Sequence, residues 1–296
     1  MPKISKIISS VTTYRIFSIF EVAALLLFLT IFYNYDAHAA GQLMVSPTRI
    51  VFEGNERTKQ VNLINNGSET GRFRISFVRR KMTENGKFEE IPENEEGKYS
   101  DEIVRFSPRQ VILAPGQSQT IRLMLRKKRG MEDGEYRSHM LFQSLPDAAT
   151  SDINKLSGDD QNEFSVQLIP VIGITIPVIV RQGNLSSTVS LSNFELHQAN
   201  TVKGQTTLSL KVNREGNSST YGDFRINFTP KDGDPIVVGE VNGIAVYTPL
   251  TNRSVEIKLK TPTGFNLSNG ELHIQYLEPG KDKNTGLIAE SRLAVP

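Results

Sequence analysis

From Leu43 onward, apolar and polar residues alternate along short segments. Apolar positions recur with a period close to two, for example at Val61 and Leu63 and again at Ile121 and Leu123. Such alternation is typical of half-buried β-strands. No window longer than about a dozen residues carries a 3.6-residue apolar period, so helices should be few and short. The pattern predicts an all-β protein.

Turn-forming residues divide the pattern into two sets of strands, and the hinge between them is expected at Gln182, Gly183 and Asn184. The second set has the size of one immunoglobulin-like sandwich. We therefore predict an all-β fold of two tandem immunoglobulin-like β-sandwich domains, residues 40–181 and 182–296. In the second domain we expect strands at 188–196, 206–212, 224–228, 236–238, 244–247, 255–259, 271–276 and 287–295, with a turn at Asn242 and Gly243.

Residues 1–39 have the layout of a secretory signal peptide. Basic residues come first, an apolar stretch follows at 22–33, and Ala37 and Ala39 supply the small residues of a cleavage site. The apolar stretch is shorter than the roughly 20 residues that span a bilayer. We expect cleavage after Ala39 and a mature protein in the periplasm, with an uncleaved anchor as the alternative.

The most distinctive segment is residues 164–181, with the sequence FSVQLIPVIGITIPVIVR. It follows a polar loop at 146–163 and is far longer than a usual strand of about 5–6 residues. Pro170 and Pro177 exclude a helix interior and a fully paired central strand. A long apolar strand of this kind belongs at a sheet edge, which other chains can pair with. The segment therefore predicts a strand that is offered to a partner.

Little in the chain points to catalysis or to a cofactor. Cys is absent, and only four His are present, with His139, His197 and His273 far apart and without a partner at metal-binding spacing. No nucleophile-elbow, zinc-protease, P-loop or dinucleotide-binding motif occurs. The net charge of +2, with interspersed signs, does not indicate nucleic-acid binding. We predict a non-enzymatic protein with no cofactor and no metal.

Arg49 is the one basic residue whose position attracts attention. It lies in the sequence VSPTRIVFEG, next to the apolar run Ile50, Val51 and Phe52. An arginine within an apolar strand needs an anionic partner if it is enclosed, and the guanidinium group suits a carboxylate because it can donate two parallel hydrogen bonds.

Three blocks in order resemble the periplasmic pilus-assembly chaperones of the chaperone–usher pathway, the PapD-like family. They are VSPTRIVFEG with the following VNLINN, then FSPRQVILAPGQSQTIRLML, then GEYRSHMLF before the polar loop and the long strand. Together they cover about residues 43–181. The second domain matches the family only in size and strand pattern.

The resemblance implies two immunoglobulin-like domains with a cleft between them. It also implies that the long strand completes a pilin-like subunit by donor-strand complementation until an outer-membrane usher takes the subunit over. Carried over by position, Arg49 corresponds to the cleft arginine that holds the subunit's C-terminal carboxylate. The opposite parity of the strand, including Ile169 and Val171, would then face the domain's own core. An offset of one residue in the alignment would exchange the two sets. The expected donor side chains are Val166, Leu168, Pro170, Ile172 and Ile174.

The chain departs from the family at one anchor position. The best-known family members carry a lysine on this strand that shares the subunit carboxylate. The corresponding position here falls at or near Pro177, and no lysine occurs between Phe164 and Val180. Arg49 would then act alone or with a basic residue from elsewhere, such as Arg122. Arg181 is a candidate for a bridge between the two domains, with a carboxylate partner that the sequence does not identify.

Three alternatives stay open at this point. The chain could be an adhesion module of two sandwiches with a fully paired long strand. It could be a secreted hydrolase, since a Ser–His–Asp triad leaves no local sequence signature. A self-capping homodimer, in which two copies pair their long strands, is compatible with the chaperone hypothesis.

Overall fold

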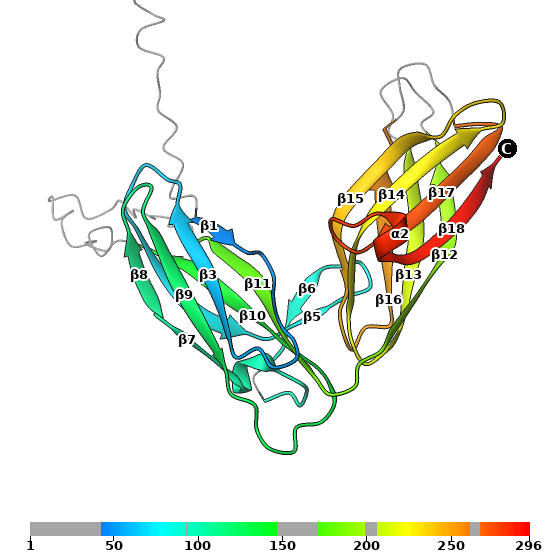
Figure 1. Cartoon of the computed structure of the whole chain (residues 1–296). Helices are drawn as coiled ribbons and strands as arrows, with labels where there is room; N and C mark the ends of the chain where they lie inside the picture. The colour runs from blue at the N-terminus through cyan, green and yellow to red at the C-terminus, as the bar shows by residue number, and fades with distance from the viewer. Residues whose placement is uncertain (1–42, 93, 147–170, 199–205, 261–266) are drawn as a thin grey trace, which may run out of the picture.

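The computed structural model describes residues 43–92, 94–146, 171–198, 206–260 and 267–296. Two β-sandwiches form the two arms of a V, which meet at the connection between β11 (Gly173–Gln182) and β12 (Ser187–His197) (Figure 1). The predicted fold class, two tandem β-sandwiches, is confirmed. The expected signal peptide at residues 1–39 lies outside the described residues. Within them, helical segments are too short or too polar to traverse a lipid bilayer.

The first sandwich packs a four-stranded sheet, in the order β1-β3-β9-β7, against a five-stranded sheet, in the order β2-β11-β10-β4-β8. The strands of the first sheet are β1 (Leu43–Ser46), β3 (Thr58–Asn65), β9 (Ser118–Leu125) and β7 (Val104–Ser107). Those of the second, besides β11, are β2 (Ile50–Phe52), β10 (Gly134–Leu145), β4 (Gly71–Val78) and β8 (Gln110–Leu113). A short 3-10 turn, η1 (Ser100–Glu102), precedes β7.

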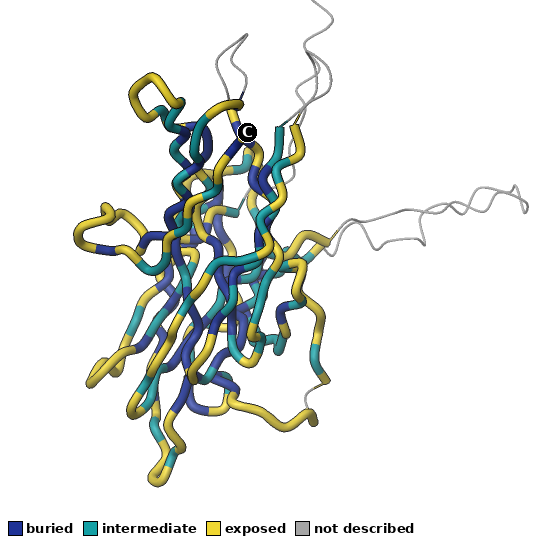
Figure 2. Tube along the Cα trace, turned by 90° about the vertical axis from the view of Figure 1, so that its right-hand side faces the viewer, coloured by how far each residue is buried: buried dark blue, intermediate teal, exposed yellow. Residues whose placement is uncertain are grey.

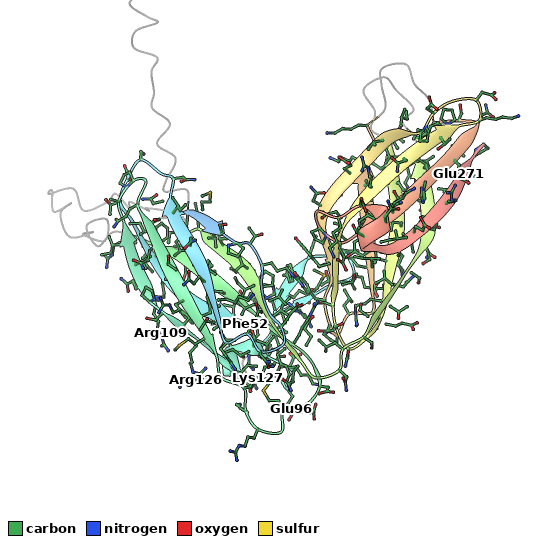
Figure 3. The ribbon with its side chains drawn as sticks, in the orientation of Figure 1. Phe52, Glu96, Arg109, Arg126, Lys127 and Glu271 are labelled. Carbon is green, nitrogen blue, oxygen red and sulfur yellow. The ribbon has the colours of Figure 1, made fainter. Side chains whose placement is uncertain are left out.

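The alternation in the sequence explains how this sandwich forms its core. Val61 and Leu63 of β3 and Ile121 and Leu123 of β9 are fully buried, whereas the residues between them are exposed or only partly buried. They meet Phe52 and other apolar residues of the facing sheet, and Figure 3 shows Phe52 inside this arm. Figure 2 shows the same result along the chain, because buried segments line the sandwich interiors and the connecting loops are exposed. One polar and one apolar face per strand is the arrangement that a sandwich requires.

The second sandwich packs the sheet β12-β13-β16 against the sheet β15-β14-β17-β18. Its core contains Phe224, Phe228 and Tyr276, which are almost completely buried. A single helical turn, α2 (Lys283–Gly286), follows β17 and is capped by the Asp282 carboxylate. The remaining strands are β13 (Thr207–Gly216), β14 (Thr220–Pro230), β15 (Ile236–Val246), β16 (Asn252–Lys258), β17 (Gly270–Leu277) and β18 (Leu287–Val295).

The expected turn at Asn242 and Gly243 is wrong. Residues 236–246 form one strand, β15, and the two residues lie in a β-bulge within it, because the pairing with β14 shifts register between Gly222 and Phe224. Gly243 has a φ of 75°, and its N–H donates to the Asp223 carboxylate over 2.8 Å. Asn-Gly is therefore used here for its positive φ inside a strand and not for a hairpin turn.

A small hairpin of the first sandwich reaches the second. It consists of β5 (Arg80–Met82) and β6 (Phe88–Glu90), and Figure 1 shows it between the two arms. The carbonyl of Glu84 in its loop accepts a hydrogen bond of 2.8 Å from the backbone N–H of Ser254 in β16. The hairpin thus braces the two sandwiches against each other above the hinge.

Candidate functional site

β11 is paired along its whole length on one side but along only a short stretch on the other. β10 pairs with it over residues 173–182 in antiparallel fashion. On the opposite side, β2 runs parallel and pairs only with Val178, Ile179 and Val180. Among the described residues, no strand pairs with that side of residues 173–177. The first part of β11 is therefore an open sheet edge.

No strand in the described part of the chain pairs with the backbone groups on the open side of this edge. The carbonyl of Ile172 accepts from the backbone N–H of Ser144 over 2.9 Å, which places residue 172 in a bonded pair with the β10 side. Bonding direction alternates along an antiparallel ladder, so the peptide groups of Gly173 and Thr175 point to the open side. Pro177, which follows in the same alternation, has no N–H to leave unpaired there.

The alternate side chains of β11 that face the core of the first sandwich are not the ones that the sequence predicts. Ile176, Val178 and Val180 are buried in the core of the first sandwich, and Ile174 packs against that core. The even-numbered side therefore faces the domain's own core, and the expectation that the parity of Val171 does so is wrong for the described part of the strand. Ile174 is partly buried, because the first sandwich still extends beneath it.

The residues just before β11 differ from those inside it. Val171 and Ile172 are 50% and 54% exposed, which is unusual for large aliphatic side chains next to a core strand. Ile172 is also held in place by Ser144, whose Oγ accepts a hydrogen bond of 3.0 Å from the Ile172 N–H. The other expected donor residues, Val166, Leu168 and Pro170, lie outside the described residues.

Arg49 lies where the open edge ends. It occupies the crossover between β1 in one sheet and β2 in the other, and since Ile50 pairs with Val178, Arg49 adjoins Pro177. Its guanidinium carbon is 4.5 Å from the ring centroid of Tyr221 and 5.3 Å from that of Tyr247. Nη1 donates a hydrogen bond of 2.8 Å to the hydroxyl of Tyr247. Both tyrosines belong to the second sandwich, so Arg49 spans the cleft.

The positive charge of Arg49 is not neutralised. No carboxylate among the described residues forms an ion pair with it, and its only partners are the two aromatic rings and one phenol. The side chain is partly buried and lines a hollow of about 630 Å³ together with Val51, Ser219 and Tyr221. A guanidinium group has five N–H donors, so most of them remain for a ligand.

Arg181 lies in the same hollow but is fully engaged. Its Nη1 is 2.5 Å from the Glu53 carboxylate and its Nε is 3.5 Å from that of Glu135. Glu135 has no exposed side-chain surface, and it accepts hydrogen bonds from the N–H and the hydroxyl of Ser219 in the second sandwich, at 3.1 and 2.5 Å. Arg181 also donates to the Ser219 carbonyl over 3.5 Å. These contacts are those of a link between the domains.

Sequence reasoning missed a second enclosed arginine, Arg137 of β10, and named Arg122 instead. Arg122 is exposed on β9, in the sheet that does not carry β11, and cannot reach the cleft. Arg137 is 7% exposed, lies 4.7 Å from the ring centroid of Tyr247, and donates to the carbonyls of Arg80 and Thr248 over 3.1 and 3.3 Å. Burial lowers its pKa. The one sequence signal for an enclosed charge was its place in the predicted strand GEYRSHMLF, which ends in the apolar residues MLF.

His139 is buried beside Arg137 and Arg80. Neither ring nitrogen has a hydrogen-bond partner, and the ring packs edge-on against Phe88 at 4.9 Å. Burial, aided by the charges of Arg137 and Arg80, lowers the pKa of His139 to about 3. The histidine is therefore neutral at neutral pH. In the described ranges, no group of three or more His, Asp and Glu could hold a metal ion.

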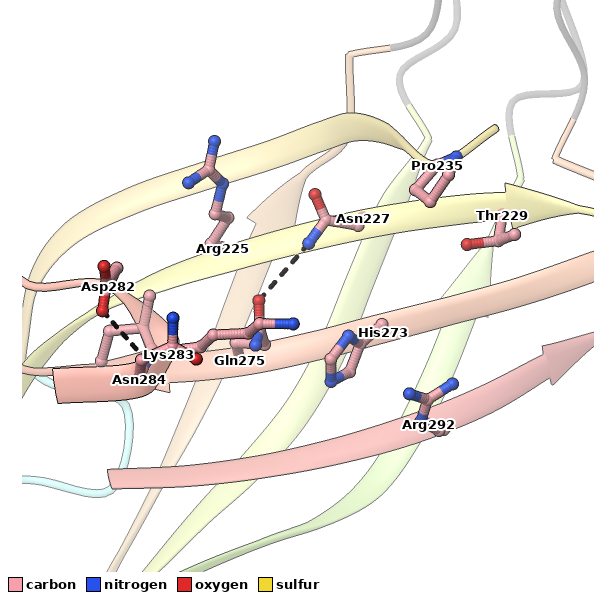
Figure 4. A pocket seen from close by; sticks show the side chains of 11 residues that line it. Arg225, Asn227, Thr229, Pro235, His273, Gln275, Asp282, Lys283, Asn284 and Arg292 are labelled. Atoms are coloured by element: carbon pink, nitrogen blue, oxygen red, sulfur yellow. Dashed lines mark hydrogen bonds between the residues drawn. The ribbon is translucent and has the colours of Figure 1, made fainter. Parts of the chain in front are cut away.

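A second hollow, of about 570 Å³, lies on the outer sheet face of the second sandwich (Figure 4). Several of its polar residues are paired, since His273 contacts Glu290 at 2.7 Å and Arg292 contacts Glu271 at 2.5 Å. Asp282, at its rim, is used to cap α2. The basic residues of this surface, Arg225, Lys283 and Arg292, are exposed to solvent, so it lacks an enclosed charge like that of Arg49.

No known family model and no curated protein matches the chain. Solved structures with a similar fold include the SafA pilin–SafB chaperone complex of Salmonella enterica, at 12% identity and a TM-score of 0.41, covering 88% of this chain and 99% of that chain. The CsuC–CsuE chaperone–tip subunit complex of Acinetobacter baumannii has 14% identity and a TM-score of 0.40, and the match covers 85% of this chain and 97% of that chain. The CupB2 chaperone of Pseudomonas aeruginosa has 11% identity and a TM-score of 0.39, and the match covers 84% of this chain and 98% of that chain. At these identities the likeness concerns the fold.

Proposed function

We propose that this protein is a periplasmic chaperone that binds pilin-like subunits by donor-strand complementation and delivers them to an outer-membrane usher. One observation carries the proposal: the open edge of β11 at residues 173–177 ends at Arg49, a cleft arginine that no carboxylate of the described residues pairs with. The edge supplies backbone hydrogen bonds to an added strand, and Arg49 supplies a fixed charge at the end of that strand.

The register supports one direction for the added strand. β2 runs parallel to β11 and begins at Ile50. A subunit strand that runs parallel along the open edge towards β2 would bring its C-terminal end to the start of β2, where Arg49 lies. A chain terminus is the one carboxylate that every subunit has at the end of its last strand. Two parallel N–H···O bonds from Arg49 would hold it.

The apolar part of the interaction comes from the segment before β11. Ile172 and the preceding even-numbered residues Val166, Leu168 and Pro170 are the proposed donors, and Ile174 is not among them. A fully buried aliphatic side chain contributes roughly 1.5–3 kcal/mol, so three or four donors contribute about 5–12 kcal/mol before the cost of ordering the segment. This gain is large enough to keep an incomplete subunit in solution.

The resemblance of residues 43–181 to pilus-assembly chaperones supports this proposal, as does the signal-like N-terminus, which favours a periplasmic location. It also favours a non-enzymatic role. Without a subunit, the open edge can pair with the same edge of a second copy, and we propose a self-capping homodimer for the free protein. Dilution in analytical ultracentrifugation should then dissociate the dimer, and adding a subunit should do the same.

A matched pair of variants tests strand addition. Thr175→Pro removes an N–H that points to the open side while leaving the β10 ladder intact, and Thr175→Val keeps that N–H but loses the side-chain hydroxyl. We expect Thr175→Pro to abolish co-purification of a β-rich periplasmic subunit, identified by mass spectrometry, and Thr175→Val to retain it. Equal capture by both variants would reject strand addition at this edge.

A second pair tests the apolar donors. Leu168→Asp together with Ile172→Asp places charges where the subunit groove would be, so capture should be lost while the melting temperature of the free chaperone stays unchanged. Ile112→Asp is the control, because Ile112 is 60% exposed on β8, at the far edge of the same sheet. Retained binding by the double variant would contradict donor-strand complementation.

A further inference from the structure

We infer that Tyr221 and Tyr247 of the second sandwich are positioning residues that orient Arg49 for capture of a polypeptide C-terminal carboxylate. The inference rests on the proposed function and deepens it. It assigns the second sandwich a direct part in binding, since the arginine comes from one domain and both of its aromatic partners come from the other.

Two contacts restrain the guanidinium group of Arg49. An arginine on a crossover segment is a long side chain with many rotamers, and holding it in one of them has an entropic cost. Here the ring of Tyr221 lies 4.5 Å from the guanidinium carbon, and the hydroxyl of Tyr247 accepts from Nη1 over 2.8 Å. One contact restrains the plane of the group and the other its rotation, so the remaining N–H donors keep a set direction.

Neither Tyr221 nor Tyr247 neutralises the charge of Arg49. A tyrosine ring attracts a cation through its quadrupole without neutralising it. Burial raises the pKa of Tyr247, so its hydroxyl stays neutral and accepts a hydrogen bond without forming an ion pair. A carboxylate in the same position would occupy the guanidinium and exclude a ligand. The two tyrosines therefore orient the charge and leave it available.

Tyr247 is itself held in place by packing. Tyr247 is 5% exposed and packs with Ile179 of β11, Met82 of the β5–β6 hairpin and Ala245. Phe88 of the hairpin lies 6.1 Å from its ring. Tyr247 is thus fixed by both sandwiches, and the position of Arg49 depends on the angle between them.

The experiment compares two probes that differ only at the terminus. The probe is the acetylated peptide Lys-Val-Thr-Val-Thr-Tyr, made with a free C-terminal carboxylate and as a carboxamide. NMR titration of the full mature protein, with the Arg49 Nε–H signal as reporter, gives both dissociation constants. A charge-assisted hydrogen bond corresponds to about tenfold or more in affinity, so the wild type should prefer the carboxylate by about that factor.

The variants are Tyr247→Phe, which removes only the hydroxyl, and Tyr221→Leu, which removes the ring face. Each should lower the preference for the carboxylate to about threefold or less, while affinity for the carboxamide stays as in the wild type. Tyr136→Phe is the control, because it removes a phenol whose hydroxyl donates to the Glu132 carbonyl, away from Arg49. It should leave the preference unchanged.

The outcomes separate the inference from the proposed function. If the wild type shows no preference for the carboxylate, both fail. If the wild type prefers it and the tyrosine variants do so equally, only the positioning role fails. An equal loss of affinity for both peptides, with a lower melting temperature, would show that the tyrosines merely support the fold and would also overturn the inference.

Discussion

Arg49 and Arg181 line the same hollow, yet their surroundings differ in one respect. Arg181 meets the carboxylates of Glu53 and Glu135, and through Glu135 it is tied to Ser219 of the other sandwich. Arg49 meets two aromatic rings and a neutral hydroxyl. A compensated charge in an interface has a structural role, whereas a held but uncompensated one is ready for a ligand.

The two parts of β11 repeat the contrast at the level of the backbone. Residues 178–180 are paired on both sides, by β10 and β2, and belong to the scaffold. Residues 173–177 have β10 on one side only. The free charge and the free edge adjoin at Pro177, and the satisfied charge and the satisfied edge adjoin at Arg181. The cleft thus has a structural end and a proposed binding end.

The largest effect is expected at the structural end. Glu135→Ala removes the buried carboxylate and leaves the N–H of Ser219 without its acceptor, so it should lower the free energy of unfolding by about 3 kcal/mol. Glu53→Ala removes an exposed partner of the same arginine and should lower it by less than about 1 kcal/mol. Urea denaturation of the two variants measures both. Similar losses would mean that the buried carboxylate is not what links the domains.

A somewhat smaller effect is expected from pH at His139, on the cation-rich side of the cleft. Its folded-state pKa of about 3 is below the unfolded value of 6.5, so between these values the unfolded chain binds a proton that the folded chain does not. Stability therefore falls as the pH drops below 6.5, and no loss arises above it. At pH 4.5 the loss should be about 2–3 kcal/mol.

The variant His139→Leu separates this effect from the titration of the carboxylates. Urea denaturation at pH 7.5 and at pH 4.5 should show a smaller pH-dependent loss in His139→Leu than in the wild type. If the loss is the same in both, His139 gains a proton in the folded protein, and the cleft must then contain an acceptor that compensates the charge.

The smallest effect on stability is expected at the binding end. Arg49→Ala removes one hydrogen bond and two cation–π contacts but no ion pair, and it also removes the cost of partly burying a charge, so the free energy of unfolding should fall by only about 1–2 kcal/mol. Subunit capture should nevertheless weaken by about tenfold or more, and Arg49→Lys should restore only part of it because it cannot bind a carboxylate with two parallel bonds. A large loss of stability with unchanged capture would make Arg49 a structural residue like Arg181.

Much of the fold was predictable, because strand formation depends on local alternation that any one segment displays. The strands of the second sandwich lie close to the predicted ranges, and the exception, β15, is informative. Asn242 and Gly243 have the composition of a hairpin turn, but the positive φ of Gly243 is equally suited to a bulge. Only pairing with β14 decides between the two.

The site was predictable only in part. Arg49 could be singled out because a charge directly precedes an apolar run, and the expected edge strand because of its length and its prolines. The partners of Arg181 were not visible, since Glu53 and Glu135 are distant in the chain. The same holds for Tyr221 and Tyr247. The expected parity failed because alternation shows two faces without showing which one meets the core.

The sequence by itself determined which segments become strands, that they form two sandwiches, and that Arg49 and residues 164–181 are unusual. These properties follow from the order of side chains within a few residues. The tertiary structure alone decided that the edge of β11 is open, that Arg181 is neutralised, and that Arg49 is oriented by the other domain without being neutralised. Such facts depend on which distant groups meet across a cleft, and contacts between distant groups leave no local pattern in the chain.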